Sequence, residues 1–317
     1  MIMTLLFSCT IHSFQSSVFF APPHYDEPFF SRLFAFLAIK SPMAFWDKIS
    51  ARGSVEDRRG MVSGVSGIGL TGIALFVGIN LLLGNSLPET LDRAIQLLPE
   101  MSSSNVSRNH VDYEGEDSYE RFASTVLGSN DEVWRSAFEK IGKQYVPPRL
   151  VLFRDQTPSS CGGATSSIGP HYCPLDSTLY LDETFFDVLT QKLGAKGGDV
   201  AQAYVIAHEG GHHVQNILGK LKTAARTNEE SVRMELQADC LAGVWAHSLK
   251  DKSVFEPNEI SEAMDAAAAV GDDRIQEKAQ GYTNPETWTH GSSEERVSAF
   301  TRGYEGGSLE TCLSRTE

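Results

Sequence analysis

One stretch limits what this chain can fold into more than any other. It is His208-Glu209-Gly210-Gly211-His212, an H-E-x-x-H pattern inside residues 201–219. Apolar residues recur there at helical spacing, Asp199 is a candidate N-cap and Gly219 is a candidate C-terminal stop. Two histidines four positions apart on a helix face the same way, so both imidazoles can bind one Zn²⁺ at about 2.0–2.1 Å. Glu209 lies off that line, which suits a base acting on zinc-bound water.

A second predicted helix, within VRMELQADCLAGVWAHSL, supplies two carboxylates. Glu235 and Asp239 are four positions apart and therefore point the same way. A catalytic zinc site uses three protein ligands and keeps one position open. We interpret His208, His212 and Glu235 as the ligands, with Asp239 accepting the second ring N–H of a histidine. The alternative is that Glu235 and Asp239 form a solvated helix face.

Six segments of the chain, two of which contain the residues described above, form a set of motifs in a fixed order. They are WDKISARGSVEDRRG, CGGATSSIGPHYCP, HEGGHHVQN, ELQADCLAGVWAH, GDDRIQ and THGSSEER. Together, from about Met43 to Cys312, they resemble the bacterial putative neutral zinc metallopeptidase family, which is gluzincin-like: H-E-x-x-H plus a Glu in an E-x-x-x-D helix. The resemblance implies an α+β, mainly helical zincin-like domain with a small sheet, one Zn²⁺ per chain and a protein or peptide substrate.

The rest of the expected domain follows from periodicity and turn signals. Ser159–Pro174 is expected to be a loop. Strands are predicted at Leu150–Phe153 and Leu179–Leu181, and helices at Tyr119–Leu127, Asp131–Ile141, Thr184–Leu193, Pro257–Val270 and Ser292–Gly303.

An apolar segment before this domain predicts one transmembrane helix over residues 65–84. No charged residue occurs from Gly60 to Pro88, and Val65–Leu83 would span roughly 28 Å as a helix. A buried core helix is the alternative, although the glycines would be costly in a soluble helix.

Basic residues suggest the orientation of that helix. Lys48, Arg52, Arg58 and Arg59 precede it closely, which predicts a cytoplasmic N-terminus and a periplasmic or extracellular catalytic domain.

The expected organisation is an N-terminal extension or mis-assigned start (1–42), a cytoplasmic segment (43–64), the transmembrane helix (65–84), a linker (85–118) and the zinc metallopeptidase domain (119–314).

Charge and cysteine content limit the partners and the compartment. A formal net charge of −14 argues against nucleic-acid binding. Four of the five cysteines fall in the region of resemblance and allow three pairings. Cys161–Cys173 would close a short loop, and Cys240–Cys312 would then join the C-terminus to the Glu235 helix. Buried free thiols, expected in a reducing compartment, are the alternative.

The predicted reaction is peptide hydrolysis through a zinc-bound water, with Glu209 as general base. His290, in a loop near the end of the domain, is the candidate second donor to the developing oxyanion, and a structural role in that loop is the alternative. In zinc peptidases of this general type, an edge strand borders the cleft and pairs with extended substrate.

Two other functions stay open at this point. One is a non-catalytic, membrane-tethered zinc protein with a binding or quality-control role. The other is a zinc hydrolase that acts on non-peptide amides. Structural zinc sites are normally closed and rich in cysteine, so three ligands beside a glutamate favour an enzyme. Neither the physiological substrate nor the oligomeric state follows from the sequence.

Overall fold

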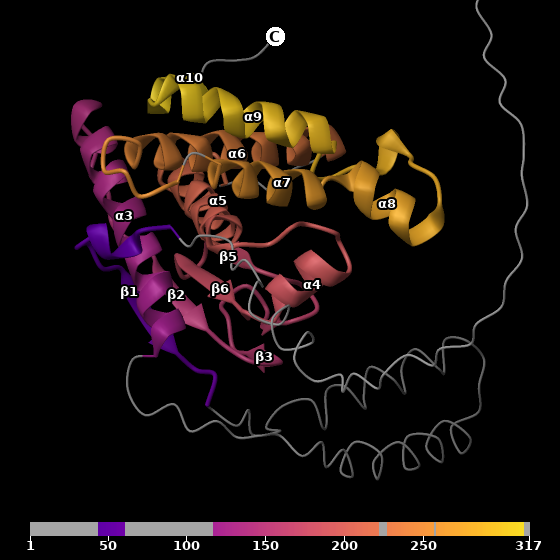
Figure 1. Ribbon diagram of the computed structural model, residues 1–317, viewed down its shortest axis with the longest axis horizontal. Coiled ribbons are helices and arrows are strands. Elements are labelled where there is room, and N and C mark those ends of the chain that lie inside the picture. Colours follow the sequence, from indigo (N-terminus) through magenta and orange to yellow (C-terminus); the bar gives the residue numbers. More distant parts are fainter. Residues whose placement is uncertain (1–43, 61–116, 222–226, 257, 314–317) are drawn as a thin grey trace, which may run out of the picture. The chain divides into compact units, whose positions relative to one another are not determined.

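A computed structural model describes residues 44–60, 117–221, 227–256 and 258–313. These residues form a mainly helical α+β fold with a small sheet, as predicted (Figure 1). The sheet has the order β1-β2-β6-β5, formed by Ser54–Asp57, Arg149–Leu152, Thr178–Leu181 and His171–Cys173. The first three strands are parallel, and β5 pairs antiparallel with β6. Every residue of β6 is buried, as expected for a short apolar strand inside a sheet.

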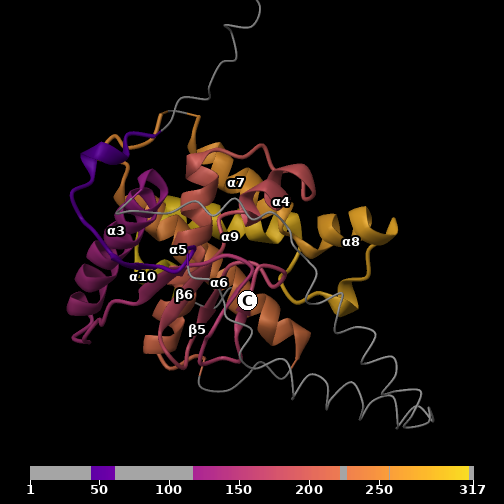
Figure 2. The ribbon, with the colours of Figure 1, turned by 90° about the horizontal axis from the view of Figure 1, so that it is seen from below.

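In the described part of the chain, seven α-helices pack beside and above this sheet, and a further short helix, α4 (Phe185–Gln191), follows β6 (Figures 1 and 2). The helix α5 lies at the centre and contacts α3, α6 and α7. The largest helix–helix contact is between α6 and α9. The helices are α3 (Ser118–Lys140), α5 (Asp199–Ile217), α6 (Asn228–Ser248), α7 (Ile260–Ala269), α8 (Asp272–Gln280), α9 (Ser293–Gly306) and α10 (Leu309–Leu313).

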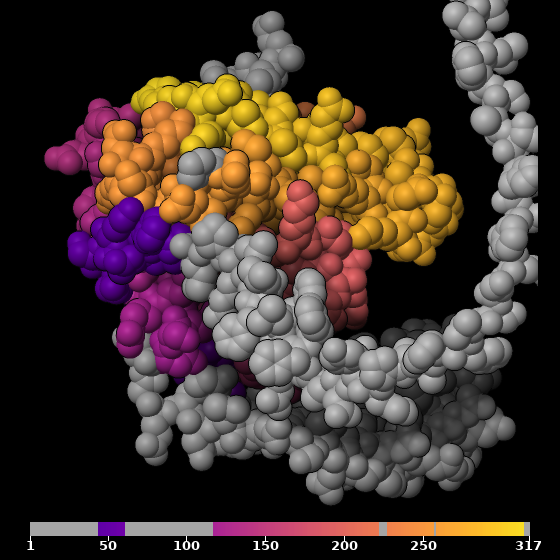
Figure 3. Space-filling model, viewed as in Figure 1, coloured from indigo at the N-terminus to yellow at the C-terminus, as the bar shows by residue number. Residues whose placement is uncertain are grey.

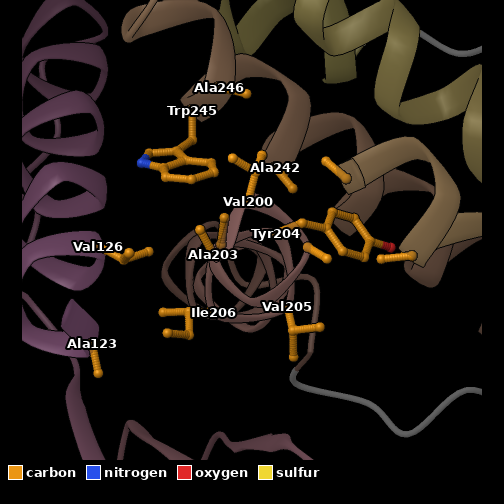
Figure 4. Close-up of a cluster of buried hydrophobic side chains, with 14 of the residues drawn as sticks. Ala123, Val126, Val200, Ala203, Tyr204, Val205, Ile206, Ala242, Trp245 and Ala246 are labelled. Carbon is orange, nitrogen blue, oxygen red and sulfur yellow. The ribbon is translucent and has the colours of Figure 1, made fainter. Parts of the chain in front are cut away.

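The main hydrophobic core surrounds α5. In the close-up of Figure 4, which looks along this helix, Val126 of α3 and Trp245 of α6 approach one side, and Tyr204 points to the other. All three side chains are buried. Because α5 is enclosed by helices, the residues it carries are held in one orientation, which is what a precise site requires.

Residues 44–60 belong to the same folded unit as the later helices. The strand β1 pairs with β2, and Trp46 Nε1 donates a hydrogen bond of 2.5 Å to Asp199 at the start of α5. In the space-filling view, the indigo segment 44–60 lies between the magenta α3 and the orange helices (Figure 3). The predicted single-pass topology is therefore wrong, because it put residues 44–60 and the catalytic domain on opposite sides of a membrane.

The predicted transmembrane helix is not supported either. Among the described residues, no helix is long and apolar enough to cross a membrane. The long helices α3 and α6 are interrupted by charged residues, and α5 carries buried histidine and glutamate. Residues 65–84 themselves lie outside the described residues.

Two local predictions need correction. The helix α3 is continuous across Gly128-Ser129-Asn130, although these residues indicated a break between two helices. A Cβ on Gly128 would overlap the backbone of Arg52, and the side chains of Ser129 and Asn130 bond to the Val126 carbonyl within the helix. Tertiary packing and local bonds thus override low helix propensity. Asp199 is the first residue of α5 rather than its N-cap, because its carboxylate binds the segment around Trp46.

The expected loop at Ser159–Pro174 contains two short strands. These are β4 (Ala164–Thr165), which pairs with β3 (Gln156–Thr157), and β5 of the main sheet. Disulfides join Cys161 to Cys173 and Cys240 to Cys312, which is the pairing that the sequence favoured. The first bridge closes the loop onto β5, and the second joins α6 to α10.

Candidate metal centre

The structure brings His208, His212 and Glu235 together. His208 and His212 project from successive turns of α5, and Glu235 comes from α6, which packs against it. One nitrogen or oxygen atom from each residue lies within 4.8 Å of the others. Glu235 Oε2 is 3.2 Å from His208 Nε2, and Glu235 Oε1 is 3.4 Å from His212 Nε2.

These distances fit a metal ion. A tetrahedron with bonds of about 2.0–2.1 Å has ligand-to-ligand edges of about 3.3–3.4 Å. Each measured separation is close to such an edge, but the two end on different oxygens of Glu235, so a carboxylate that binds through one oxygen uses only one of them as an edge. Two imidazoles and one carboxylate also form a donor set that suits Zn²⁺ and leaves a fourth position open. The residues present therefore fit the ion that the sequence predicts.

The free ring nitrogen of His208 is held by Asp239. His208 Nδ1 lies 2.8 Å from Asp239 Oδ1, which leaves Nε2 facing Glu235. Asp239 is fully buried and also accepts hydrogen bonds from Tyr204 Oη at 2.6 Å and from Arg296 Nε at 2.9 Å. Such contacts fix the tautomer and the direction of a metal-binding imidazole.

The free ring nitrogen of His212 has a different partner. Its Nδ1 lies 2.9 Å from Gln215 Oε1. The orientation of the Gln215 amide is set on its other side, where Nε2 donates to the Met234 carbonyl at 2.7 Å. His212 therefore donates through Nδ1 and presents Nε2 to Glu235.

The electrostatics of the cluster favour positive charge. Burial opposes ionisation of Glu235, but the charges and hydrogen bonds of His212 and His208 outweigh it and hold the pKa of Glu235 well below its usual range. Burial likewise opposes protonation of His208, yet Asp239 and Glu235 raise its pKa. A divalent cation can take the place of those protons, since metal binding and proton release are coupled.

Glu209 lies next to His208 and is buried. Its Oε2 atom is shielded from solvent and has no hydrogen-bond partner among the described residues. A buried carboxylate oxygen without a partner is costly and uncommon, and it marks a position where a water or ligand belongs. Glu209 also lines the cleft described next.

A cleft of 1120 Å³ opens over the cluster. His208, Glu209, His212 and Glu235 form part of its lining. Residues on β5, namely His171 and Tyr172, line it as well, and β5 is the last strand in the described order of the sheet. The cleft is therefore bordered by a strand at the edge of the described sheet, a position where an extended peptide can add by strand pairing.

His290 also lines this cleft, and its side chain is half exposed. Its loop is held by Asp272 at the start of α8. The Asp272 carboxylate accepts backbone N–H groups from Thr289, His290 and Gly291, and Asp272 Oδ1 lies 3.2 Å from His290 Nδ1. His290 Nε2 is therefore the ring atom left for a ligand in the cleft.

The other histidines in the described part of the chain have structural contacts. His213 is buried, with Nδ1 near Tyr172 Oη and Nε2 near the Val146 carbonyl. His247 Nδ1 lies 2.7 Å from the Tyr304 carbonyl. His171 stacks on Tyr180 at the border of the cleft. None of them joins the group formed by His208, His212 and Glu235 in the described part of the chain.

Sequence reasoning missed two residues of the site, Tyr204 and Gln215, and did not place Arg296 beside Asp239. Tyr204 and Gln215 lie one turn before His208 and almost one turn after His212, so helical spacing could have indicated both. Arg296 comes from α9, and no local pattern places it beside Asp239. The adjacent Gly211 has a packing reason, because a Cβ there would lie 2.9 Å from the Ala238 carbonyl oxygen of α6.

Comparison with known proteins identifies the family of this chain. The family model described as "Putative neutral zinc metallopeptidase" matches residues 44–314. "Uncharacterized protein YpfJ" of Escherichia coli K12 is 48% identical over 206 residues, which cover 62% of this chain and 71% of YpfJ. "Uncharacterized protein Mb2605" of Mycobacterium bovis is 46% identical over 198 residues, 58% of this chain and 66% of Mb2605. No solved structure gives a significant match. The match over residues 44–314 shows that the chain belongs to the putative neutral zinc metallopeptidase family.

Proposed function

We propose that this protein is a zinc-dependent peptidase, with His208, His212 and Glu235 holding the metal and Glu209 acting as general base. The observation that carries the proposal is the buried, unpartnered Glu209 Oε2 beside the His/His/Glu cluster in the cleft. A zinc ion held by three protein ligands acts as a Lewis acid and lowers the pKa of a water to about 7.

Glu209 is suited to proton transfer by its position. Its carboxylate takes a proton from the attacking water and returns it to the leaving amine. Its Oε2 has no hydrogen-bond partner among the described residues, so this oxygen is not already bound to another side chain. Asp239 and Gln215 meanwhile keep the two imidazoles in the tautomer that directs Nε2 at the metal position.

His290 is proposed to donate a hydrogen bond to the developing oxyanion. Asp272 holds its backbone and its Nδ1, so Nε2 can face the substrate. The β5 edge is proposed to align an extended peptide across the cleft. The position of His290 and of the β5 residues in the cleft lining supports these two proposed roles.

The test compares the full wild-type chain with Glu209→Gln, measuring bound zinc per chain and cleavage of unfolded casein. We expect zinc in both and a loss of cleavage of about 10²- to 10⁴-fold in Glu209→Gln. Glu259→Gln is the matched control, because Glu259 is also buried with one unpartnered carboxylate oxygen among the described residues, at the start of α7.

Two outcomes would count against the proposal. Equal cleavage by wild type and Glu209→Gln would remove Glu209 as the base. Bound zinc with no cleavage of any unfolded protein or peptide would favour the non-catalytic zinc protein, or a hydrolase of other amides.

A further inference from the structure

A chain of hydrogen bonds connects His212 to the C-terminal helix. Gln215 Oε1 accepts from His212 Nδ1 at 2.9 Å, and Gln215 Nε2 lies 3.3 Å from Gln237 Oε1. Gln237 Nε2 in turn donates to the Cys312 carbonyl at 2.7 Å. The chain thus runs from α5 through α6 to α10, across 100 positions of sequence from His212 to Cys312.

The hydrogen bonds allow each of the two glutamine side-chain amides only one orientation of its oxygen and nitrogen. Gln215 Nε2 donates both to Met234 and to Gln237, so its oxygen must face His212. Gln237 accepts from Gln215 through its oxygen and must therefore donate through its nitrogen. Gln215 is fully buried, where an amide without hydrogen-bond partners destabilises the fold. The Cys312 carbonyl thus sets the orientation of Gln237, whose oxygen gives the Gln215 amide a second acceptor beside the Met234 carbonyl.

The helix that supplies this carbonyl depends on outside anchors. It has only five residues, Leu309–Leu313, and a helix this short does not persist by itself. It is held by the Cys240–Cys312 disulfide and by the packing of Leu309 in a cluster with Trp134 and Leu241. Cys240 directly follows Asp239 in α6.

The other histidine is supported quite differently. His208 Nδ1 is held by Asp239, which Arg296 and Tyr204 hold from α9 and α5. The hydrogen bonds that support His208 thus come from residues of α5, α6 and α9, and they do not involve α10. Weakening of α10 should therefore act on the site through His212 rather than through His208.

We propose that Gln215 and Gln237 are positioning residues that transmit the anchoring of α10 to His212, so that metal retention depends on the Cys240–Cys312 disulfide. The inference rests on the proposed zinc site and adds to it a structural dependence on the end of the chain. It predicts that a bond remote from the metal governs metal affinity.

The experiment measures zinc affinity of the full, folded chain by competition with a chelator. Gln215→Leu should raise the Kd for zinc about 10- to 100-fold, as loss of a partner of a metal ligand commonly does. Gln237→Leu and the double variant Cys240→Ser/Cys312→Ser should raise it by a smaller factor, similar for the two. Gln202→Leu on the same helix and Cys161→Ser/Cys173→Ser are the matched controls and should keep the wild-type Kd.

Two further readouts separate positioning from general destabilisation. The visible absorption of the Co²⁺-loaded protein should change in Gln215→Leu and Gln237→Leu but not in Gln202→Leu. Gln215→Glu keeps an acceptor for His212 Nδ1 but loses the amide donor to Met234 and Gln237, so it should restore only part of the zinc affinity that Gln215→Leu loses.

The outcomes are distinct. Wild-type zinc affinity and cobalt spectrum in folded Gln237→Leu would overturn the inference, whether or not the disulfide variant folds. Absence of zinc binding by the wild-type chain would overturn the proposed function and this inference together. Weakened zinc binding in Gln215→Leu, Gln237→Leu and the Cys240/Cys312 variant, with unchanged controls, would establish it.

Discussion

Asp239 and Arg296 form a buried ion pair directly behind the candidate metal centre. Arg296 Nε lies 2.9 Å from Asp239 Oδ2, and Arg296 Nη2 lies 3.0 Å from Oδ1, the same oxygen that faces His208 Nδ1. Both residues are almost inaccessible to solvent. The pair therefore joins the fold of α6 and α9 to the direction of one histidine of the cluster.

Removing one partner of this pair should lower the stability of the protein strongly. Arg296→Met leaves the Asp239 carboxylate buried without its main positive partner, so we expect the free energy of unfolding to fall by about 3–5 kcal/mol. Urea unfolding in the presence of a chelator measures this loss without a contribution from zinc. Lys252→Met, which removes an exposed pair with Glu132, should cost at most about 1 kcal/mol. Equal losses of unfolding free energy in Arg296→Met and Lys252→Met would show that the buried pair stabilises the fold no more than the exposed pair does.

Asp131 should make stability depend on pH. Burial raises its pKa to about 6, against the hydrogen bond from Tyr145 and the charge of Arg135, which lower it. The folded state then binds the proton more tightly than the unfolded state, so stability falls as pH rises from about 4 through about 6.

Asp131→Asn removes that dependence because the amide stays neutral. At pH 8 we expect the variant to be more stable than wild type by up to about 3 kcal/mol, and the gain should vanish near pH 4. Unfolding free energies of both proteins across this range measure it. Glu132→Gln, an exposed neighbour on α3, controls for loss of one negative charge. A gain from Asp131→Asn that is the same at pH 4 and pH 8 would contradict the prediction.

Gly303 lets α6 and α9 approach closely. A Cβ on Gly303 would overlap the Cys240 carbonyl oxygen, and backbone cannot yield as a flexible side chain can. Gly303→Ala should therefore destabilise the protein by about 3 kcal/mol, although Gly→Ala inside a helix is usually favourable. Thermal or urea unfolding measures the change. Gly60→Ala is the control, because its Cβ would meet no atom of the described residues within 4 Å, and it should stay within about 0.5 kcal/mol of wild type.

Metal removal should lower stability only when the three ligands are present. Zinc at about 100 times its Kd adds about 2.7 kcal/mol to the folded state. A chelator should therefore lower the Tm of the wild-type chain, and Glu235→Ala, which lacks one ligand, should show no such response. A Tm of the wild-type chain that is insensitive to both zinc and chelator would argue against a metal site at this cluster.

The local parts of the site could be predicted because helices convert spacing into direction. Residues four apart share a face, so H-E-x-x-H and E-x-x-x-D each indicated a pair of side chains pointing the same way. Closeness along the chain also favoured the Cys161–Cys173 pairing, because this bridge closes a short loop. These predictions depend on residues close in the chain, and tertiary structure had only to bring α5 and α6 together.

The wrong predictions arose where distant segments compete with local signals. Residues 44–60 look like a polar segment before an apolar stretch, yet β1 pairs with β2 and Trp46 packs near Trp245 and Phe255. Gly128-Ser129-Asn130 look like a break, yet the contact with Arg52 keeps them helical. A local sequence pattern cannot predict a contact with a residue that lies far away in the sequence.

The sequence by itself determined the chemical groups of the site: two imidazoles four positions apart on one helix, a glutamate next to the first of them, and a carboxylate on a second helix. It also indicated a mainly helical α+β fold. Only the tertiary structure decided what supports each group. It placed Arg296 behind Asp239, aligned Gln215 and Gln237 with the Cys312 carbonyl, and left Glu209 Oε2 buried without a partner among the described residues. The physical reason is that ligand direction follows from local helix geometry, whereas burial and hydrogen-bond partners depend on how separate helices pack.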